Sequence, residues 1–502
     1  RFSEKYLLGK QMARPLWTGA DWQFSDLQRV YDACERIALK DMKLSCYPNQ
    51  LEIISSEQML DAYASIGMPI FYQHWSFGKH FVQQQKSYQS GHSGLAYELV
   101  INSSPCINYL MEDNTMTTQA LVIAHAAFGH NHFFRNNYLF RQWTDATSIV
   151  DYLIFAKNYI AEQETKHGRQ AVETWLDSCH ALMDYGVNRY KRPGKLSLAE
   201  EEQRQKERTE YLQSQVTELY RILPAKGQDK TVEKIFPEQP EENLLYFFEK
   251  YSPDIQIWQR EILRIVRKIA QYFYPQGQTK VMNEGFASLT HWEIMNRLHE
   301  KGLTTNGAHL EFLALHTNVL YQPDFNSSHY SGINPYAFGF AILRDIQRMC
   351  GDPTAEDKKW FPQITGANAR ELILDAVANY RDESFIRQWL SPKVIRDWRL
   401  FSLHDDKSNE DEYTVSNIHN ERGYHDIREK LADQYLRAAS VPHIEVVEVS
   451  KKTKTLNLRY TSHRGRKLGN TEKLMPHIFR LWGDYPVTIK DQDGNLLSFK
   501  QD

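Results

Sequence analysis

Three histidines lie close together in a segment that is otherwise largely apolar. They are His125, His130 and His132, and they follow the apolar run 120–123. Neutral imidazole is the commonest metal ligand in proteins and the usual proton carrier near neutral pH. We therefore interpret the segment as part of a candidate metal-binding or catalytic site. The alternative is a set of buried core histidines that are satisfied by hydrogen bonds.

The spacing of the first two histidines differs from that of a self-contained zinc motif. His125 and His130 are five residues apart, which is about 140° of rotation on an ideal α-helix, so they would not share a face. The zinc-peptidase motif HExxH places its histidines four apart, and Ala126 stands where that motif has its general base. Gly129 could end or distort the helix and bring His130 back toward His125. The remaining groups of a site must then come from elsewhere in the chain.

A second segment supplies a carboxylate and an imidazole on one predicted helix. Glu284 and His291 are seven residues apart, which places them on one face about 10 Å apart along the helix axis. The small and apolar residues between them predict a closely packed helix, and a buried carboxylate needs a partner because an unpaired buried charge is costly. The candidate partners are a metal ion, His125 or His130. A structural hydrogen bond between Glu284 and a histidine is the alternative.

Further carboxylates and imidazoles occur in apolar surroundings. Glu98 lies in the run 97–102, and Glu311 and His316 form an acid–imidazole pair later in the chain. Single carboxylates in such runs are often paired with Arg or Lys, but several of them on otherwise apolar helices could converge on one cavity. His180 is a lone histidine on an apolar helix face, and we interpret it as a core histidine.

Composition predicts a large folded protein. Hydrophobic residues make up 41% of the 502 residues, and 60 basic against 63 acidic residues give a net charge of −3, which offers no electrostatic argument for nucleic acid. No apolar run approaches the roughly 18 residues of a membrane span, and residues 1–5 lack the apolar part of a signal peptide. The five cysteines are scattered and never in CxxC spacing. We therefore expect reduced thiols in a cytoplasmic protein.

Hydrophobic periodicity predicts a mainly α fold. Apolar residues at three-to-four spacing predict helices at 145–164, 171–187 and 254–273, the last of them ended by Pro275 and Gly277. Past about residue 440 the apolar period changes from 3.6 to 2. There we expect a hairpin, one short helix and a last hairpin, at 443–460, 472–482 and around 493–495.

These patterns predict a large helical body over about 1–435 and a small α+β domain over about 436–502. A charged, Gln-rich and then Pro-rich stretch at about 192–242 differs in composition from the rest. We interpret it as an exposed helix and a mobile loop that join two halves of the helical body. We therefore expect it to be a solvated linker and not a binding tail.

Several long motifs resemble those of the stage V sporulation protein R family, in the form found in proteobacteria that do not form spores. Together with the C-terminal segment they cover nearly the whole chain. The matching segments are 47–50, 74–79, 95–98, 124–137, 283–285, 332–336 and 381–385. The resemblance implies a cytoplasmic protein tied to spore cortex formation, or to starvation and stress responses in other bacteria. It also implies a PrkA-type serine kinase and a von Willebrand A-like protein as partners.

The resemblance does not supply a biochemical activity. The absence of several well-known motifs argues against some classes of enzyme. The chain contains no P-loop, no dinucleotide-binding GxGxxG and no GxSxG, so nucleotide-dependent and serine-hydrolase functions lose support. The segment 283–287 is similar to the Glu-Gly-Trp-Ala-type helix of some metallopeptidase-like families. Ala126 departs from the usual zinc-peptidase pattern, which puts a peptidase mechanism in doubt.

The first function hypothesis is a metal-dependent hydrolase. His125, His130 and Glu284 would hold a zinc, iron or manganese ion, and His291 or Glu98 would complete the site or act in catalysis. A spare carboxylate would activate water, and an acylated amino sugar or a peptide would suit the connection to the spore cortex.

The second hypothesis is a non-enzymatic scaffold or regulator that acts with the kinase and the von Willebrand A-like protein. In that case the histidines would form a buried polar network that fixes the core. The segment 195–240 and the C-terminal domain would be the contact surfaces. A metal analysis of the purified protein separates the two hypotheses.

Overall fold

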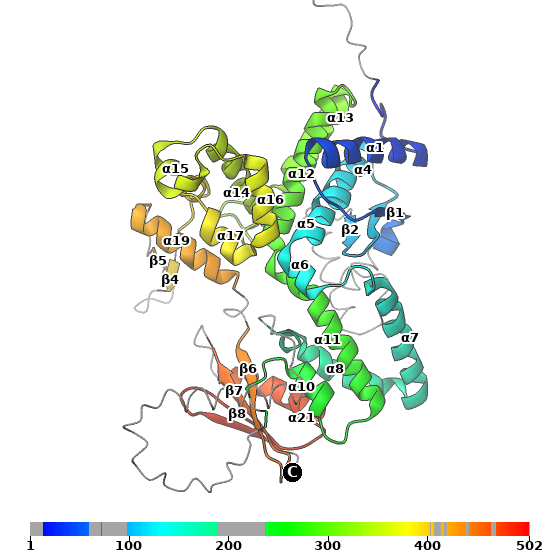
Figure 1. The fold of residues 1–502 in the computed structure, drawn as a ribbon, viewed down its shortest axis with the longest axis vertical. Coiled ribbons are helices and arrows are strands. Elements are labelled where there is room, and N and C mark those ends of the chain that lie inside the picture. Colours follow the sequence, from blue (N-terminus) through cyan, green and yellow to red (C-terminus); the bar gives the residue numbers. More distant parts are fainter. Residues whose placement is uncertain are drawn as a thin grey trace, which may run out of the picture. The chain divides into compact units, whose positions relative to one another are not determined.

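A computed structural model describes most of the chain (Figure 1). The described residues are 14–59, 72, 98–188, 236–237, 239–401, 403–405, 413–415, 419–436, 441–462 and 468–500. They are mainly α-helical, with a small strand-containing C-terminal part, which confirms the predicted fold class. Most of the predicted linker at about 192–242 and the motifs at 74–79 and 95–97 lie outside the described residues. Among the described helices, none is both long and apolar enough to cross a membrane.

Contacts divide the chain into two compact units. The first unit contains Arg1–Leu176 and Gln271–Val441, and the second contains Asp177–Ala270 and Pro442–Asp502. Each unit is therefore assembled from two separate stretches of sequence. The candidate site residues belong to the first unit.

The first unit is built mainly from helices. Short polar side chains begin many of them, because a side-chain oxygen there accepts one of the backbone N–H groups that lack a partner in the first turn. Thr115, Thr305 and Asn334 do this for α4, α13 and α14. The helices are α1 (Phe24–Arg36), η1 (Ile37–Asp41), α4 (Met116–Val122), η2 (Ile123–His130), α5 (Asn131–Asn136), α6 (Tyr138–Trp143), α7 (Ile149–His167), α12 (Lys280–Glu300), α13 (Asn306–Val319), α14 (Pro335–Gly351), α15 (Ala355–Trp360), η5 (Pro362–Ile364), α16 (Ala369–Asn379), α17 (Asp382–Trp389), α18 (Pro392–Asp397) and α19 (Glu421–Gln434).

Helix α12 lies at the centre of the first unit and is buried on nearly every side. Its side chains Val281, Phe286, Leu289, Ile294 and Leu298 are fully buried. It packs against η2 and against α14. Helix α13 follows it in the chain and contacts it as well (Figure 1). The helix also buries polar residues such as Asn283 and His291, so its central position is set by packing and not by apolar composition alone.

Residues without bulky side chains allow the backbones of these helices to approach closely. A Cβ atom on Gly129 of η2 would lie 2.6 Å from the Cα of Ala287 in α12. A Cβ on Gly285 of α12 would lie 2.5 Å from the Cα of Gly339 in α14, and a Cβ on Gly339 would overlap the carbonyl oxygen of Val281. Two of these glycines are direct neighbours of His130 and Glu284, so the close approach fixes the spacing of the candidate site.

A three-stranded sheet also belongs to the first unit, and the sequence patterns did not predict it. Strand β3 (Cys106–Met111) lies between β1 (Asn49–Ile54), with which it is parallel, and β2 (Glu98–Ile101), with which it is antiparallel. Five of the six residues of β3 are buried, so its apolar run lacks the alternation that marks a half-exposed strand. A two-stranded antiparallel pair, β4 (Leu403–Asp405) and β5 (Tyr413–Val415), follows α18.

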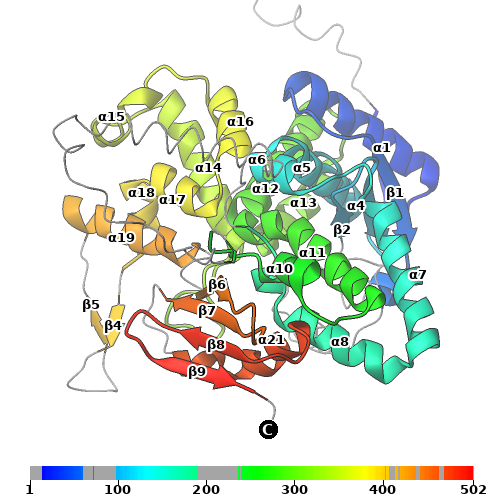
Figure 2. The same cartoon turned by 60° about the horizontal axis from the view of Figure 1, so that its bottom comes forward.

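The second unit contains the C-terminal sheet, whose strand order is β6–β7–β8–β9 (Figure 2). Both predicted hairpins are confirmed, because β6 pairs with β7 and β8 pairs with β9 in antiparallel fashion, while β7 and β8 are parallel. The predicted short helix is confirmed as α21. The bounds are η3 (Met183–Tyr185), α10 (Leu244–Tyr251), β6 (His443–Val449), β7 (Leu456–Thr461), η6 (Leu468–Leu474), α21 (Met475–Leu481), β8 (Val487–Lys490) and β9 (Leu496–Phe499).

The structure confirms the predicted end of one long helix and contradicts the predicted end of another. Helix α7 stops before Gly168, as expected, and that glycine has a φ of 85°, a conformation that favours glycine at a helix end. The prediction that Pro275 and Gly277 end the other helix is wrong, since α11 (Ile257–Gln278) continues through both. Pro275 and Gln278 are buried, so packing of this face outweighs the one backbone hydrogen bond that proline removes. The remaining predicted helix is α8 (Arg169–Ala181).

The close approach of α12 and α14 predicts that one methyl group added at the contact strongly lowers the stability of the protein. We expect Gly339→Ala to lower the free energy of unfolding by about 1–3 kcal/mol, because the added Cβ meets backbone atoms that cannot move independently. Gly351→Ala at the end of the same helix is the matched control, since nothing lies within 4 Å of the added Cβ. Chemical denaturation measures both variants, and equal stability of the two would contradict the proposed packing constraint.

Candidate metal centre

The segment that carries the histidines is a π-helical stretch and not an α-helix. The segment η2 continues directly from α4 and leads directly into α5. In a π-helix the hydrogen bonds run from residue i to i+5 and the turn is wider, so residues five apart lie much nearer to one face than in an α-helix. His125 and His130 therefore share a face, and their ring centroids are 4.7 Å apart. The expectation that an ideal helix would separate them does not apply, because the local helix is wider.

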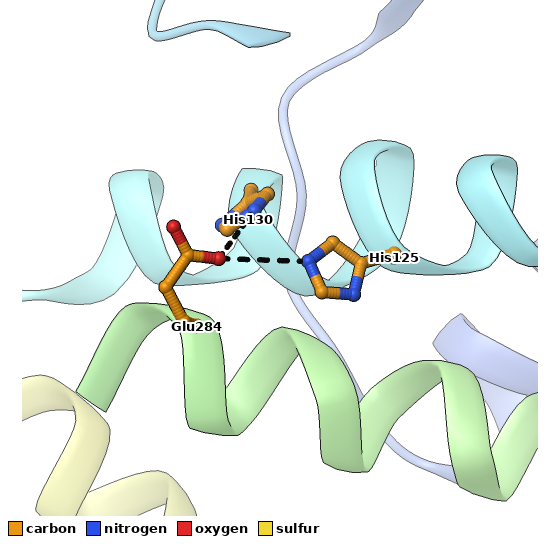
Figure 3. Close-up of side chains that lie close together, drawn as sticks. All are labelled: His125, His130 and Glu284. Atoms are coloured by element: carbon orange, nitrogen blue, oxygen red, sulfur yellow. Dashed lines mark ion pairs between the residues drawn. The ribbon is translucent and has the colours of Figure 1, made fainter. Parts of the chain in front are cut away.

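Glu284 of α12 points at both imidazoles. Its Oε2 atom lies 3.4 Å from Nε2 of His130 and 3.7 Å from Nε2 of His125 (Figure 3). One donor atom from each of the three residues lies within 4.8 Å of the other two. The three side chains come from two helices that the contact between Gly129 and Ala287 holds close together.

The orientation of His130 is set by the residue next to Glu284. Nδ1 of His130 lies 2.9 Å from Oδ1 of Asn283. An amide oxygen can only accept, so Nδ1 carries the proton and donates it. In the neutral ring, Nε2 then presents its lone pair toward Glu284. A hydrogen bond from the distant ring nitrogen to a fixed acceptor is the arrangement by which metal-binding histidines are usually oriented.

His125 begins a chain of three hydrogen-bonded imidazoles. Its Nδ1 lies 2.8 Å from Nδ1 of His291, and Nε2 of His291 lies 2.7 Å from Nδ1 of His316. If each neutral ring donates to the next, all three rings have a consistent arrangement of protons, and Nε2 of His125 also keeps its lone pair for the site. His291 uses both ring nitrogens in this chain and is fully buried. Its geometry thus suits orientation of His125.

Electrostatics favour neutral rings at His291 and His316 and an ionised carboxylate at Glu284. Burial lowers the pKa of His291 well below its usual range, and it lowers the pKa of His316 to about 4. Burial alone would raise the pKa of Glu284, but His130 and His125 outweigh it and hold the pKa below its ordinary value. An ionised carboxylate is the form in which a glutamate binds a metal.

Aromatic rings line the polar groups. Phe134 stacks against His130 with ring centroids 5.9 Å apart, and Tyr336 stacks against His125 at 6.1 Å. His125 is fully buried, whereas 16% of the Glu284 side chain is exposed. The Oε2 atom that faces the two imidazoles is nevertheless buried, so among the described residues the three donor groups are largely shielded from solvent.

Comparison with known proteins identifies the family. The family described as SpoVR like protein matches residues 21–440, and the SpoVR-like C-terminal domain matches residues 442–494. The chain belongs to the SpoVR family. It is 55% identical over 485 residues to "Uncharacterized protein YcgB" of Escherichia coli (strain K12). The matched residues cover 95% of this chain and 94% of that protein. No solved structure matches.

Three other residues singled out from the sequence of this SpoVR protein are not among the three donor groups. Glu311 accepts a hydrogen bond of 2.7 Å from Thr115 Oγ1 at the start of α4, so it serves a helix end. His180 is half-buried on α8. Glu98 begins β2, a strand and not one of the expected helices, and its side chain lies outside the described part.

His132 has a structural role in this SpoVR protein. Its Nδ1 accepts the backbone N–H of Ser45 at 2.9 Å, and its ring packs on Phe286 of α12. Burial lowers the pKa of His132 to about 4. The roles of Asn283 and His316 were missed from the sequence. Asn283 could have been noticed because it precedes Glu284, and His316 was noted only as a partner of Glu311.

These buried imidazoles predict a pH dependence of stability. The pKa of His132 is about 4 in the folded protein and about 6.5 in an unfolded chain, so the unfolded state binds its proton first as pH falls. The stabilisation is therefore complete above about pH 6.5 and is lost as pH falls toward 4. Between pH 7.5 and 5, His132→Asn should reduce the loss of unfolding free energy by about 1–2 kcal/mol, because asparagine keeps an acceptor for Ser45.

Denaturation at the two pH values measures this effect. His329→Asn is the control, because His329 is exposed and its removal should leave the pH dependence unchanged. A His132→Asn protein that loses as much stability as the wild type on acidification would contradict the assignment of a neutral, buried His132.

Proposed function

We propose that this SpoVR protein binds one divalent transition metal ion through Nε2 of His125, Nε2 of His130 and a carboxylate oxygen of Glu284, and that it acts as a metal-dependent hydrolase. The observation that carries the proposal is the pair formed by His130 and Glu284. Nδ1 of His130 donates to Asn283, which directs Nε2 toward the Glu284 carboxylate at 3.4 Å. Together with Nε2 of His125 these donor atoms lie within 4.8 Å of one another, and a cation between them would be attracted by the carboxylate and by both ring nitrogens.

The separations suit an ion of the proposed kind. A tetrahedral zinc site with bonds of about 2.0–2.1 Å separates its ligand atoms by about 3.3–3.5 Å. The two nitrogen–oxygen distances, 3.4 and 3.7 Å, lie close to this range. The third separation, between the two histidine nitrogens, is within 4.8 Å. Two imidazoles and one carboxylate also suit iron and manganese, so the donor set leaves zinc, iron and manganese as candidates.

Three protein ligands leave at least one coordination position for water or substrate. An ion held there would lower the pKa of a coordinated water and polarise a substrate carbonyl. The chain supplies the orientation of the ligands through Asn283, His291 and His316. Ala126 provides no general base beside His125, so a carboxylate from another segment must take that role, and we propose Glu98.

The family connection supports a substrate related to the cell wall. We propose an acylated amino sugar or a peptide as the substrate class, in a cytoplasmic protein of starvation, stress or sporulation physiology. A PrkA-type serine kinase and a von Willebrand A-like protein remain the proposed partners. The same kinase would be the central partner if the three residues formed only a structural ion pair.

Metal analysis of the purified protein tests the proposal. We expect about one zinc, iron or manganese ion per chain, because all three donors are provided within one chain. His125→Ala and Glu284→Ala should lose the ion while circular dichroism still reports a folded helical protein. His329→Ala, which removes an exposed histidine, should keep it.

A folded wild-type protein that contains no metal, and takes up none of the three ions on dialysis, would contradict the metal site. The scaffold hypothesis would then be favoured. Hydrolysis of N-acetylated muropeptides by metal-loaded protein, compared with Glu284→Ala, tests the reaction class.

The hydrogen bond between Asn283 and His130 predicts a loss of affinity when it is removed. Asn283→Leu should weaken metal binding about 10- to 100-fold, the usual effect of removing the group that orients a ligand histidine. Asn296→Leu is the control on the same helix, because Asn296 hydrogen-bonds only the backbone of Trp292. Equal affinity of the Asn283→Leu variant and the wild type, measured by competition with a chelator, would refute the orienting role.

A further inference from the structure

The start of α12 lacks a capping side chain from its own segment. The preceding residue, Thr279, makes no capping hydrogen bond to the first turn, and its hydroxyl instead donates to the carbonyl of Pro275. The first N–H groups of a buried helix need acceptors, because an unpaired buried polar group is costly. At α12 the acceptor comes from a distant part of the chain.

Asp382, the first residue of α17, provides both acceptors. Its Oδ2 accepts the N–H of Val281 and its Oδ1 accepts the N–H of Met282, each at 2.9 Å. Only 2% of Asp382 is exposed. The two bonds hold one carboxylate plane against two successive peptide groups, which restrains both the position and the rotation of the first turn.

This first turn leads directly into the candidate metal centre. Asn283 and Glu284 follow Met282 without a break, and Gly285 then meets α14 at the close contact with Gly339. The Glu284 carboxylate is therefore placed between two restraints, Asp382 before it and the glycine contact after it. Movement of the first turn would displace Glu284 and the Asn283 oxygen that orients His130 together.

Asp382 is an unusual choice for a helix cap. Burial, with a smaller contribution from the negative charge of Glu284, raises the pKa of Asp382 to about 7 in spite of the backbone N–H groups whose hydrogen bonds it accepts. Neutral side chains such as Thr305 and Asn368 begin other helices of the same unit without burying a charge. A buried carboxylate here costs stability, and an ion held by Glu284 would offset part of that cost by its positive charge.

We propose that Asp382 is a positioning residue of the metal centre, which holds the first turn of α12 so that Glu284 and Asn283 face His125 and His130. The inference rests on the proposed metal site and goes beyond it by including a residue that touches none of the three donor atoms. The function of the carboxylate is geometric, because its two oxygens each occupy one N–H group of the turn.

Cobalt(II) binding tests the inference, because the visible absorption of cobalt(II) reports the number and geometry of its ligands. We expect Asp382→Ala to bind cobalt(II) about 10- to 100-fold more weakly than the wild type and to change its visible spectrum. Asp382→Asn keeps one accepting oxygen, so its affinity should lie between the two. Chelator competition measures the affinities, and thermal unfolding is followed for every protein.

Asp357→Asn is the matched control. Asp357 is also a buried carboxylate at a helix start, where it accepts hydrogen bonds from Thr354 before α15 and from the Arg348 guanidinium, and it lies outside α12. We expect this variant to lose stability and yet bind cobalt(II) within twofold of the wild type with an unchanged spectrum. A loss of affinity in Asp357→Asn as large as that in Asp382→Asn would overturn the inference, because affinity would then follow stability alone.

The outcomes separate the inference from the proposed function. If the wild type binds neither cobalt(II) nor a native metal, the metal site itself fails and the inference fails with it. If the wild type binds cobalt(II) and Asp382→Ala binds it with the same affinity and spectrum, only the positioning role is overturned. If Asp382→Ala does not fold, Asp382→Asn decides, and wild-type affinity and spectrum in that variant would overturn the inference.

Discussion

The close approach of α12 to its neighbours is the constraint on which the rest of the first unit depends. Gly129 faces Ala287 and Gly285 faces Gly339 at distances that leave no room for an added Cβ. Helices whose backbones meet in this way cannot slide or rotate without steric overlap. The positions of His130 and Glu284, each next to one of these glycines, follow from that packing and not from contacts between the two side chains.

The π-helical stretch is the second feature that brings the candidate ligands together. It places His125 and His130 on one face, where an α-helix would turn them apart. Such stretches are rare in proteins and occur often at functional sites. Its persistence here, within a fully buried segment, is consistent with a function for the two imidazoles that a structural core would not require.

Further polar groups of this core hydrogen-bond to the candidate ligands or to the helix that carries them. Asn283 orients His130, and His291 and His316 extend from His125. Asp382 supports the helix that carries Glu284. The hydrogen bonds of the first three residues fix where ring protons and lone pairs lie, and those of Asp382 fix the helix backbone. A purely structural ion pair would not need that degree of order, whereas metal ligands do.

The sequence by itself determined the mainly helical fold, both C-terminal hairpins and the residue types that meet at the site. These properties follow from local periodicity, turn residues and side-chain chemistry. Only the tertiary structure decided that η2 is a π-helix, that α11 continues past Pro275, and that His316 faces His291 and not Glu311. Asp382 and the strands β1–β3 likewise depend on contacts between distant segments. Local patterns cannot supply such partners, because the packing of helices against one another selects them.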